Sequence, residues 1–215
     1  MKIPRTLATN IQRKLCLMVY DCSYADGFTT GLCENNDHRV SWQMAVDTLH
    51  RLISCGLIWI PEAKDPGLHE NEAVNIGYIR DLAMNDPFSG DMDAHEVWCQ
   101  WDLCLTDRAL EIIARNGLFD ADYGERMAPL WRLEAEKIKG ENSFIKEAYN
   151  KKSTDLCKWS SISRASGWTA GRSFDALVPE FIDSMENIFS GFGLDWDGQP
   201  LLVVGTAAGS QRGGQ

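Results

Sequence analysis

The segment 41–60, SWQMAVDTLHRLISCGLIWI, constrains the fold more than any other part of the chain. Apolar residues recur at three- and four-residue spacings from Trp42 to Ile53, which predicts an amphipathic helix that Ser41 caps. Gly56 suits the left-handed conformation that ends many helices, and the apolar LIWI that follows it predicts a short strand. We therefore expect a helix, a glycine stop and a strand in direct succession.

A second strand and helix are predicted further along the chain. HEVWCQWDLCLT, residues 95–106, is rich in apolar and aromatic residues and predicts a strand. Thr106 is a good N-cap for a helix that turns Ile113 inward and ends at Gly117. A further helix is predicted between the two strands, over residues 70–84.

These two segments together resemble the winged helix-turn-helix fold over about residues 10–119. In that family a recognition helix runs into the first wing strand, here at Gly56, Leu57 and Ile58, and the second wing strand leads into another helix, here at Leu105 and Thr106. The resemblance implies that helix 42–54 reads DNA with its outward residues, which are Gln43, His50 and Arg51. The chain departs from the family because its wing would have to hold residues 61–95.

After about residue 122 the pattern is mainly helical. Helices are predicted over 123–140, 144–152 and 173–193, with a loop over 160–173 and a short final strand over 199–204. Pro179 is expected in the first turn of the last of these helices. The expected fold is mostly α with a small β component (α+β).

The predicted organisation has two halves and a tail. A winged-helix-like half, residues 1–120, packs against a helical half, residues 121–205. Residues 206–215 are small and polar, which predicts a disordered tail.

The net charge of −10 is concentrated in one part of the chain. Residues 61–120 hold four basic and thirteen acidic residues, a net charge of −9. Proteins bind DNA largely by neutralising its phosphates with Lys and Arg, so this segment disfavours DNA binding. The same charge favours a basic protein partner and speeds its approach.

The acidic segment supplies the predicted contact residues. They are Asp86, Asp91, Asp93, Glu96 and Asp102, with Trp98 or Trp101 as an aromatic anchor. On a strand over 95–106 the odd spacing of the two tryptophans would place one ring inward and the other outward. The alternative is that the tryptophans pack in the core and that an exposed ring has no binding role.

No catalytic or metal-binding motif stands out in the sequence. The motifs GxSxG, HExxH and GxxxxGK[ST] are absent, so no catalytic residues and no cofactor are predicted. DMDAHE, residues 91–96, has ligands that could hold a divalent ion, but we favour a solvated acidic loop there. We predict no metal site.

The cysteines and the N-terminus point to the cytoplasm. Seven cysteines at irregular spacings, without a CxxC pair, predict free thiols in a reducing compartment. The N-terminus lacks the pattern of a secretory signal, and no apolar stretch is long enough to span a membrane.

The sequence therefore favours an acidic cytosolic protein that binds and inhibits a basic partner. The most specific version is an immunity protein that neutralises a nuclease-type toxin by covering its active site. The alternative is a winged-helix transcriptional regulator that binds DNA through residues 42–54. A third hypothesis is an enzyme whose site no motif reveals, which a deep pocket with converging titratable groups would support.

Overall fold

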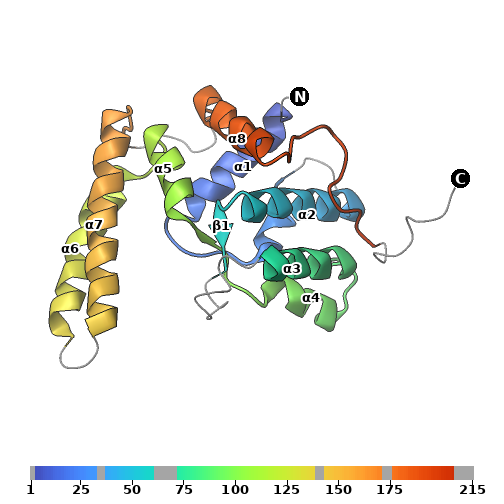
Figure 1. The fold of residues 1–215 in the computed structure, drawn as a ribbon, viewed down its shortest axis with the longest axis horizontal. Coiled ribbons are helices and arrows are strands. Elements are labelled where there is room, and N and C mark those ends of the chain that lie inside the picture. Colours follow the sequence, from blue (N-terminus) through green and yellow to red (C-terminus); the bar gives the residue numbers. More distant parts are fainter. Residues whose placement is uncertain (1–2, 33–36, 61–71, 139–142, 171–175, 206–215) are drawn as a thin grey trace, which may run out of the picture.

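The computed structural model describes residues 3–32, 37–60, 72–138, 143–170 and 176–205, with residues 72–76 described by their backbone alone (Figure 1). The fold is mostly helical with one small two-stranded antiparallel sheet, as predicted. In chain order the elements are α1 (Arg5–Leu17), the 3₁₀ helix η1 (Ala25–Phe28), α2 (His38–Ser54), β1 (Ile58–Trp59), α3 (Glu72–Met84), α4 (Met92–Cys99), β2 (Cys104–Leu105), α5 (Asp107–Arg115), α6 (Ala121–Lys137), α7 (Ser143–Ala165) and α8 (Pro179–Gly191).

Helix α2 lies at the centre of the molecule (Figure 1). It begins earlier than predicted, because the carboxylate of Asp37 accepts hydrogen bonds from the backbone N–H groups of Arg39 and Val40 and caps the helix before Ser41 is reached. The predicted stop is confirmed, since Gly56 has φ of 63°. Helix, glycine and strand thus follow one another as the sequence indicates.

The two short strands pair where the sequence places them. Ile58 lies opposite Leu105, and the following helix α5 is capped by Thr106, whose Oγ1 accepts a hydrogen bond from the N–H of Ala109. The same hydroxyl donates to the carbonyl oxygen of Gly56 at 2.8 Å. One threonine therefore joins the end of α2 to the start of α5.

The predicted strand over residues 95–106 is wrong for most of its length. Residues 92–99 form helix α4, which Asp91 caps by accepting a hydrogen bond from the N–H of Asp93. Ala94 and Trp98 are four residues apart and are the buried residues of this helix. Only Cys104 and Leu105 pair as a strand, so the alternation expected for the two tryptophans does not apply.

The chain returns to α1 and α2 after the hairpin of α6 and α7 (Figure 1). Gln12 of α1 is fully buried, and its side chain donates to the carbonyl oxygen of Ala176 and accepts from the N–H of Val178. Helix α8 then begins at Pro179, which lies in its first turn as predicted, although the helix was predicted from residue 173. The described residues after Asp120 thus divide between a hairpin and a segment, 176–205, that packs into the same core as α1 and α2.

Helix α7 extends into the region predicted as a loop. In its last turns Ser160 donates to the carbonyl oxygen of Leu156, and Ser163 donates to the carbonyl oxygen of Phe119, which attaches the helix to the segment before α6. The predicted strand over 199–204 is not formed, because these backbone groups bond to α2 instead. The predicted tail, 206–215, lies outside the described residues.

Candidate functional site

The outward face of α2 is covered by the C-terminal segment, residues 194–204. Arg51 is 1% exposed and donates hydrogen bonds to the carbonyl oxygens of Leu194 at 3.0 Å and Asp195 at 3.1 Å. Its guanidinium carbon lies 4.2 Å from the ring centroid of Trp196. Carbonyl dipoles and an aromatic face replace water around this charge, so Arg51 fastens the segment to α2.

Gln43 holds the same segment nearer its end. Its Nε2 donates to the carbonyl oxygen of Leu202 at 2.7 Å, and its Oε1 accepts from the N–H of Val204 at 3.0 Å. His50 is half-buried, and burial, followed by the charge of Arg51, lowers its pKa. The residues predicted to read DNA therefore do not form an open face, and contact with DNA here would require the segment to leave.

A buried carboxyl completes this attachment. Asp47 accepts a hydrogen bond from the N–H of Leu201 at 2.9 Å, and its Oδ1 lies 3.9 Å from Nη1 of Arg51. Burial raises the pKa of Asp47 to about 6, although the bond from Leu201 and the charge of Arg51 act in the opposite direction. The outward face of α2 is thus a buried polar interface within the molecule.

The predicted contact carboxylates lie on and around α4. Asp93 and Glu96 are exposed on the helix itself. Asp91 is its N-cap, and Asp86 accepts a hydrogen bond from the N–H of Phe88 in the preceding loop, so both also shape the backbone. Asp102 follows the helix and is half-buried. The structure therefore places four of the five on one helix and the loop that leads into it.

Sequence reasoning missed three further residues of this surface. Asp81 is exposed on α3, and Met84 and Met92 are 49% and 75% exposed at the end of α3 and the start of α4. A helical pattern over residues 92–99 would have indicated Met92. We call Asp81, Met84, Asp86, Asp91, Met92, Asp93, Glu96 and Asp102 the acidic surface.

The predicted aromatic anchors do not lie open on this surface. Trp98 is fully buried and donates from Nε1 to the carbonyl oxygen of Asn85 at 2.7 Å, so it cannot be an anchor without repacking the core. Trp101 is half-buried and packs against the core. The exposed apolar side chains here are the two methionines instead.

One cysteine and one histidine lie together on α4. Sγ of Cys99 is 3.5 Å from Nε2 of His95, and Asp26 of η1 also hydrogen-bonds this thiol. Burial, and then Asp26, raise the pKa of Cys99, which disfavours the thiolate that a nucleophile needs. Within the described residues no group of three or more His, Cys, Asp or Glu side chains could hold a metal ion.

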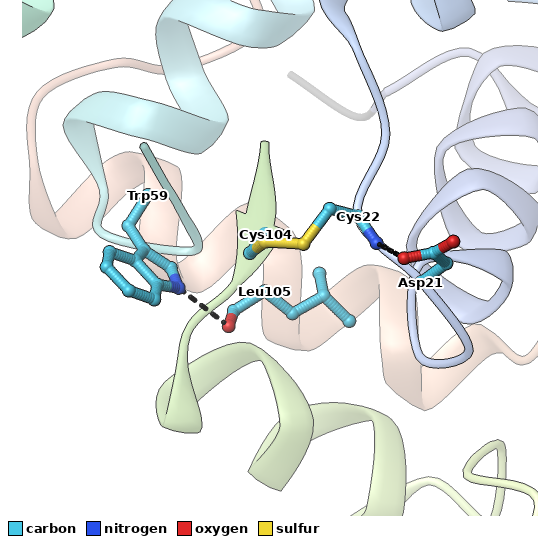
Figure 2. The surroundings of a disulfide bond; sticks show 5 residues. All are labelled: Asp21, Cys22, Trp59, Cys104 and Leu105. Carbon is cyan, nitrogen blue, oxygen red and sulfur yellow. Dashed lines mark hydrogen bonds between the residues drawn. A yellow bond between two sulfur atoms is a disulfide. The ribbon is translucent and has the colours of Figure 1, made fainter. Parts of the chain in front are cut away.

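Two cysteines predicted as free thiols form a disulfide (Figure 2). Cys22, after α1, bonds to Cys104 of β2, with the two Cα atoms 4.7 Å apart. An isolated β-bridge between Ser23 and Leu103 pairs the two chain segments beside the disulfide. Trp59 on the paired strand is partly exposed and donates to the carbonyl oxygen of Leu105 (Figure 2).

The other described cysteines agree with the prediction of free thiols. Cys16 and Cys55 are buried and in no disulfide, and Cys157 is an exposed thiol in no disulfide. The disulfide removes part of the argument for a reducing compartment, because such bonds persist mainly in oxidising ones.

Comparisons of this chain with family models, curated proteins and solved structures gave no match. The resemblance to winged-helix proteins therefore stays a prediction from the sequence. Among the helices that the structure describes, none is both long and apolar enough to cross a membrane.

Proposed function

We propose that this protein binds and inhibits a basic protein through the acidic surface. The single observation that carries the proposal is the charge of residues 77–106. Six carboxylates, at positions 81, 86, 91, 93, 96 and 102, are accompanied there by one basic residue, Arg80. A surface of one sign attracts a partner of the opposite sign and excludes partners of its own.

The acidic surface also carries two exposed apolar side chains, both methionines. Met84 and Met92 stand exposed among the carboxylates, on either side of the loop 85–91. Methionine is flexible and polarizable, and it adapts to the shape of a partner. Apolar contacts surrounded by a charged rim are typical of protein interfaces, in which the charges steer the encounter and the apolar side chains slow dissociation.

The specific form of the proposal is an immunity protein that acts in the cytoplasm. A nuclease-type toxin has a basic cleft for nucleic acid, and a carboxylate-rich surface can occupy that cleft in place of phosphates. Cytoplasmic action further requires that the fold be kept whether or not Cys22 and Cys104 are bonded.

A capture experiment with matched variants tests the proposal. The test variant carries Asp81→Asn, Asp93→Asn and Glu96→Gln, three exposed carboxylates that cap no helix. The control variant carries Glu134→Gln, Glu147→Gln and Asp183→Asn, which changes the net charge equally at exposed sites away from the acidic surface. Each tagged protein is incubated with native lysate and eluted with increasing salt.

The wild type and the control variant are expected to retain the same basic protein, and salt is expected to release it. The test variant is expected to lose most of it. Equal retention by all three proteins, or retention of nucleic acid alone, would show that the acidic surface is not the binding site.

A further inference from the structure

The hairpin of α6 and α7 exposes apolar side chains that nothing in the described chain covers. They are Leu130, Leu133, Phe144 and Ile145, and Phe144 is 79% exposed. The hairpin extends away from the other helices and joins them through α5 and the base of α6 (Figure 1). Large apolar side chains concentrated on one element are typical of an interaction surface.

The hairpin also has a groove on one side, lined by residues of α6 and α7. It has a volume of about 380 Å³, and it is lined by Glu125, Ala128, Pro129, Arg132, Leu133, Glu136, Ser153 and Cys157. Small and apolar side chains form most of it, and Leu133 stands at its edge with 51% of its surface exposed. The groove therefore fits an apolar side chain presented by another helix.

The charges in the groove point to its occupant. Glu125 is already engaged by Arg164, whose Nη2 lies 2.8 Å from its Oε2. Arg132 and Glu136 form no ion pair with any other described residue, and they lie one turn apart on α6. A partner helix that presents a glutamate and an arginine in the reverse order would match both.

We propose that the occupant is the α6 helix of a second copy of this chain, so that the protein is a two-fold symmetric dimer. In two antiparallel copies of α6 that cross at the level of residue 134, Arg132 of each copy lies beside Glu136 of the other. A two-fold axis makes every contact twice, which a self-complementary pair of charges satisfies. Leu133 of each copy then enters the groove of the other at the end that Leu133 and Glu136 form.

The proposed dimer leaves the acidic surface open. Helices α3 and α4 lie on the opposite side of the molecule from the hairpin (Figure 1). The dimer therefore presents two acidic surfaces, and the proposal stands independently of what binds there.

Sedimentation velocity over a range of protein concentrations tests the dimer. The wild type is expected to be dimeric at about 100 µM, and Leu133→Glu is expected to raise the dimer Kd at least about tenfold, because it replaces an apolar side chain by a charge at the dimer contact. Leu17→Glu is the matched control, since Leu17 is 49% exposed on α1 and lies outside the hairpin. It is expected to leave the dimer Kd unchanged.

Charge exchange tests the pairing. Arg132→Glu and Glu136→Arg are each expected to weaken the dimer, and the double exchange is expected to restore the Kd to within about threefold of the wild type, since it reverses both pairs. A monomeric wild type, a dimer that survives Leu133→Glu, or a double exchange that behaves like the single ones would each overturn the proposal.

Cys157 gives a second readout that needs no substitution. It is an exposed free thiol that lines the groove, whereas Cys99 is a partly exposed free thiol on α4. Modification of Cys157 by a maleimide is expected to slow at least several-fold as protein concentration rises through the dimer Kd, and that of Cys99 is expected not to change. Equal concentration dependence at both thiols would contradict the proposed surface.

Discussion

The core around α2 and the hairpin of α6 and α7 are held together in different ways. Around α2, polar side chains such as Gln12, Gln43 and Arg51 reach across to backbone groups more than a hundred residues away in the chain. In the hairpin, small residues bring two neighbouring helices close together, with Gly124 against Ser160. The core is fixed by long-range hydrogen bonds, and the hairpin by local packing.

This difference indicates which surfaces of the protein are open to contact with a partner. A buried polar interface is costly to break, since every group left unpaired carries its full desolvation cost. The outward face of α2 is therefore closed, although its sequence suggests an open recognition helix. The hairpin and the acidic surface keep their exposed apolar side chains, and both are available for contacts.

The largest effect is expected from replacing Arg51, which holds the C-terminal segment on α2. Arg51→Ala should lower the free energy of unfolding by about 3–5 kcal/mol, because it leaves Asp47 and two backbone carbonyls buried without their partner. Urea denaturation measures this, with Arg126→Ala on the exposed surface of α6 as the control. Equal stability of the two variants would mean that the C-terminal segment is not bound to α2.

The disulfide is the next strongest constraint. Replacing Cys22 and Cys104 by serine should cost about 2–4 kcal/mol, since the bond closes a loop with a sequence separation of 82 residues. Reductant should destabilise the wild type by a similar amount and leave the double variant unchanged. A wild type whose unfolding does not respond to reductant would argue against the bond.

The pH dependence of stability tests the buried carboxyl. Because the pKa of Asp47 is raised to about 6 in the folded protein, the folded chain retains a proton that the unfolded chain releases above about pH 4. Relative to an Asp47→Asn variant, the wild type should therefore lose up to about 3 kcal/mol of stability as pH rises from about 4 to about 6. Denaturation curves across this range measure the difference, and parallel curves for both proteins would rule out the raised pKa.

The hairpin is expected to be sensitive to one added methyl group. A Cβ at Gly124 would press on the hydroxyl of Ser160 and lie 2.9 Å from Cε1 of Phe119. Gly124→Ala should therefore cost about 1–3 kcal/mol. Gly191→Ala, at the end of α8 with no atom within 4 Å of the added Cβ, is the control and should be neutral or slightly stabilising. The reverse order of stabilities would refute the close packing of the two helices.

Local sequence signals predicted the parts of the fold that depend on local physics. The stop at Gly56, the cap at Thr106 and the start of α8 at Pro179 all follow from backbone conformation or from one hydrogen bond near in sequence. Asp37 begins α2 ahead of the predicted cap Ser41, and Asp91 begins α4 where an acidic loop and a strand were predicted. A search for Asp at these positions could have found both.

The covering of α2 could not be read from the sequence. Val204 and Leu202 bond to Gln43 across a separation that no periodic pattern reports, and the pairing of Cys22 with Cys104 is likewise long-range. The acidic surface was partly predictable, because its charge is contiguous in the chain. Its methionines were not predicted, because the pattern of residues 91–106 indicates a loop and a strand rather than the helix that exposes Met92.

The measurement that tests the proposed function most directly is the association rate of the captured basic partner as a function of ionic strength. We expect the wild-type rate to fall steeply as salt rises, because exposed carboxylates steer the encounter. The variant Asp81→Asn, Asp93→Asn and Glu96→Gln should associate roughly tenfold more slowly at low salt and respond less to salt. The same rate and salt dependence for both proteins would contradict the assignment of the acidic surface as the binding site.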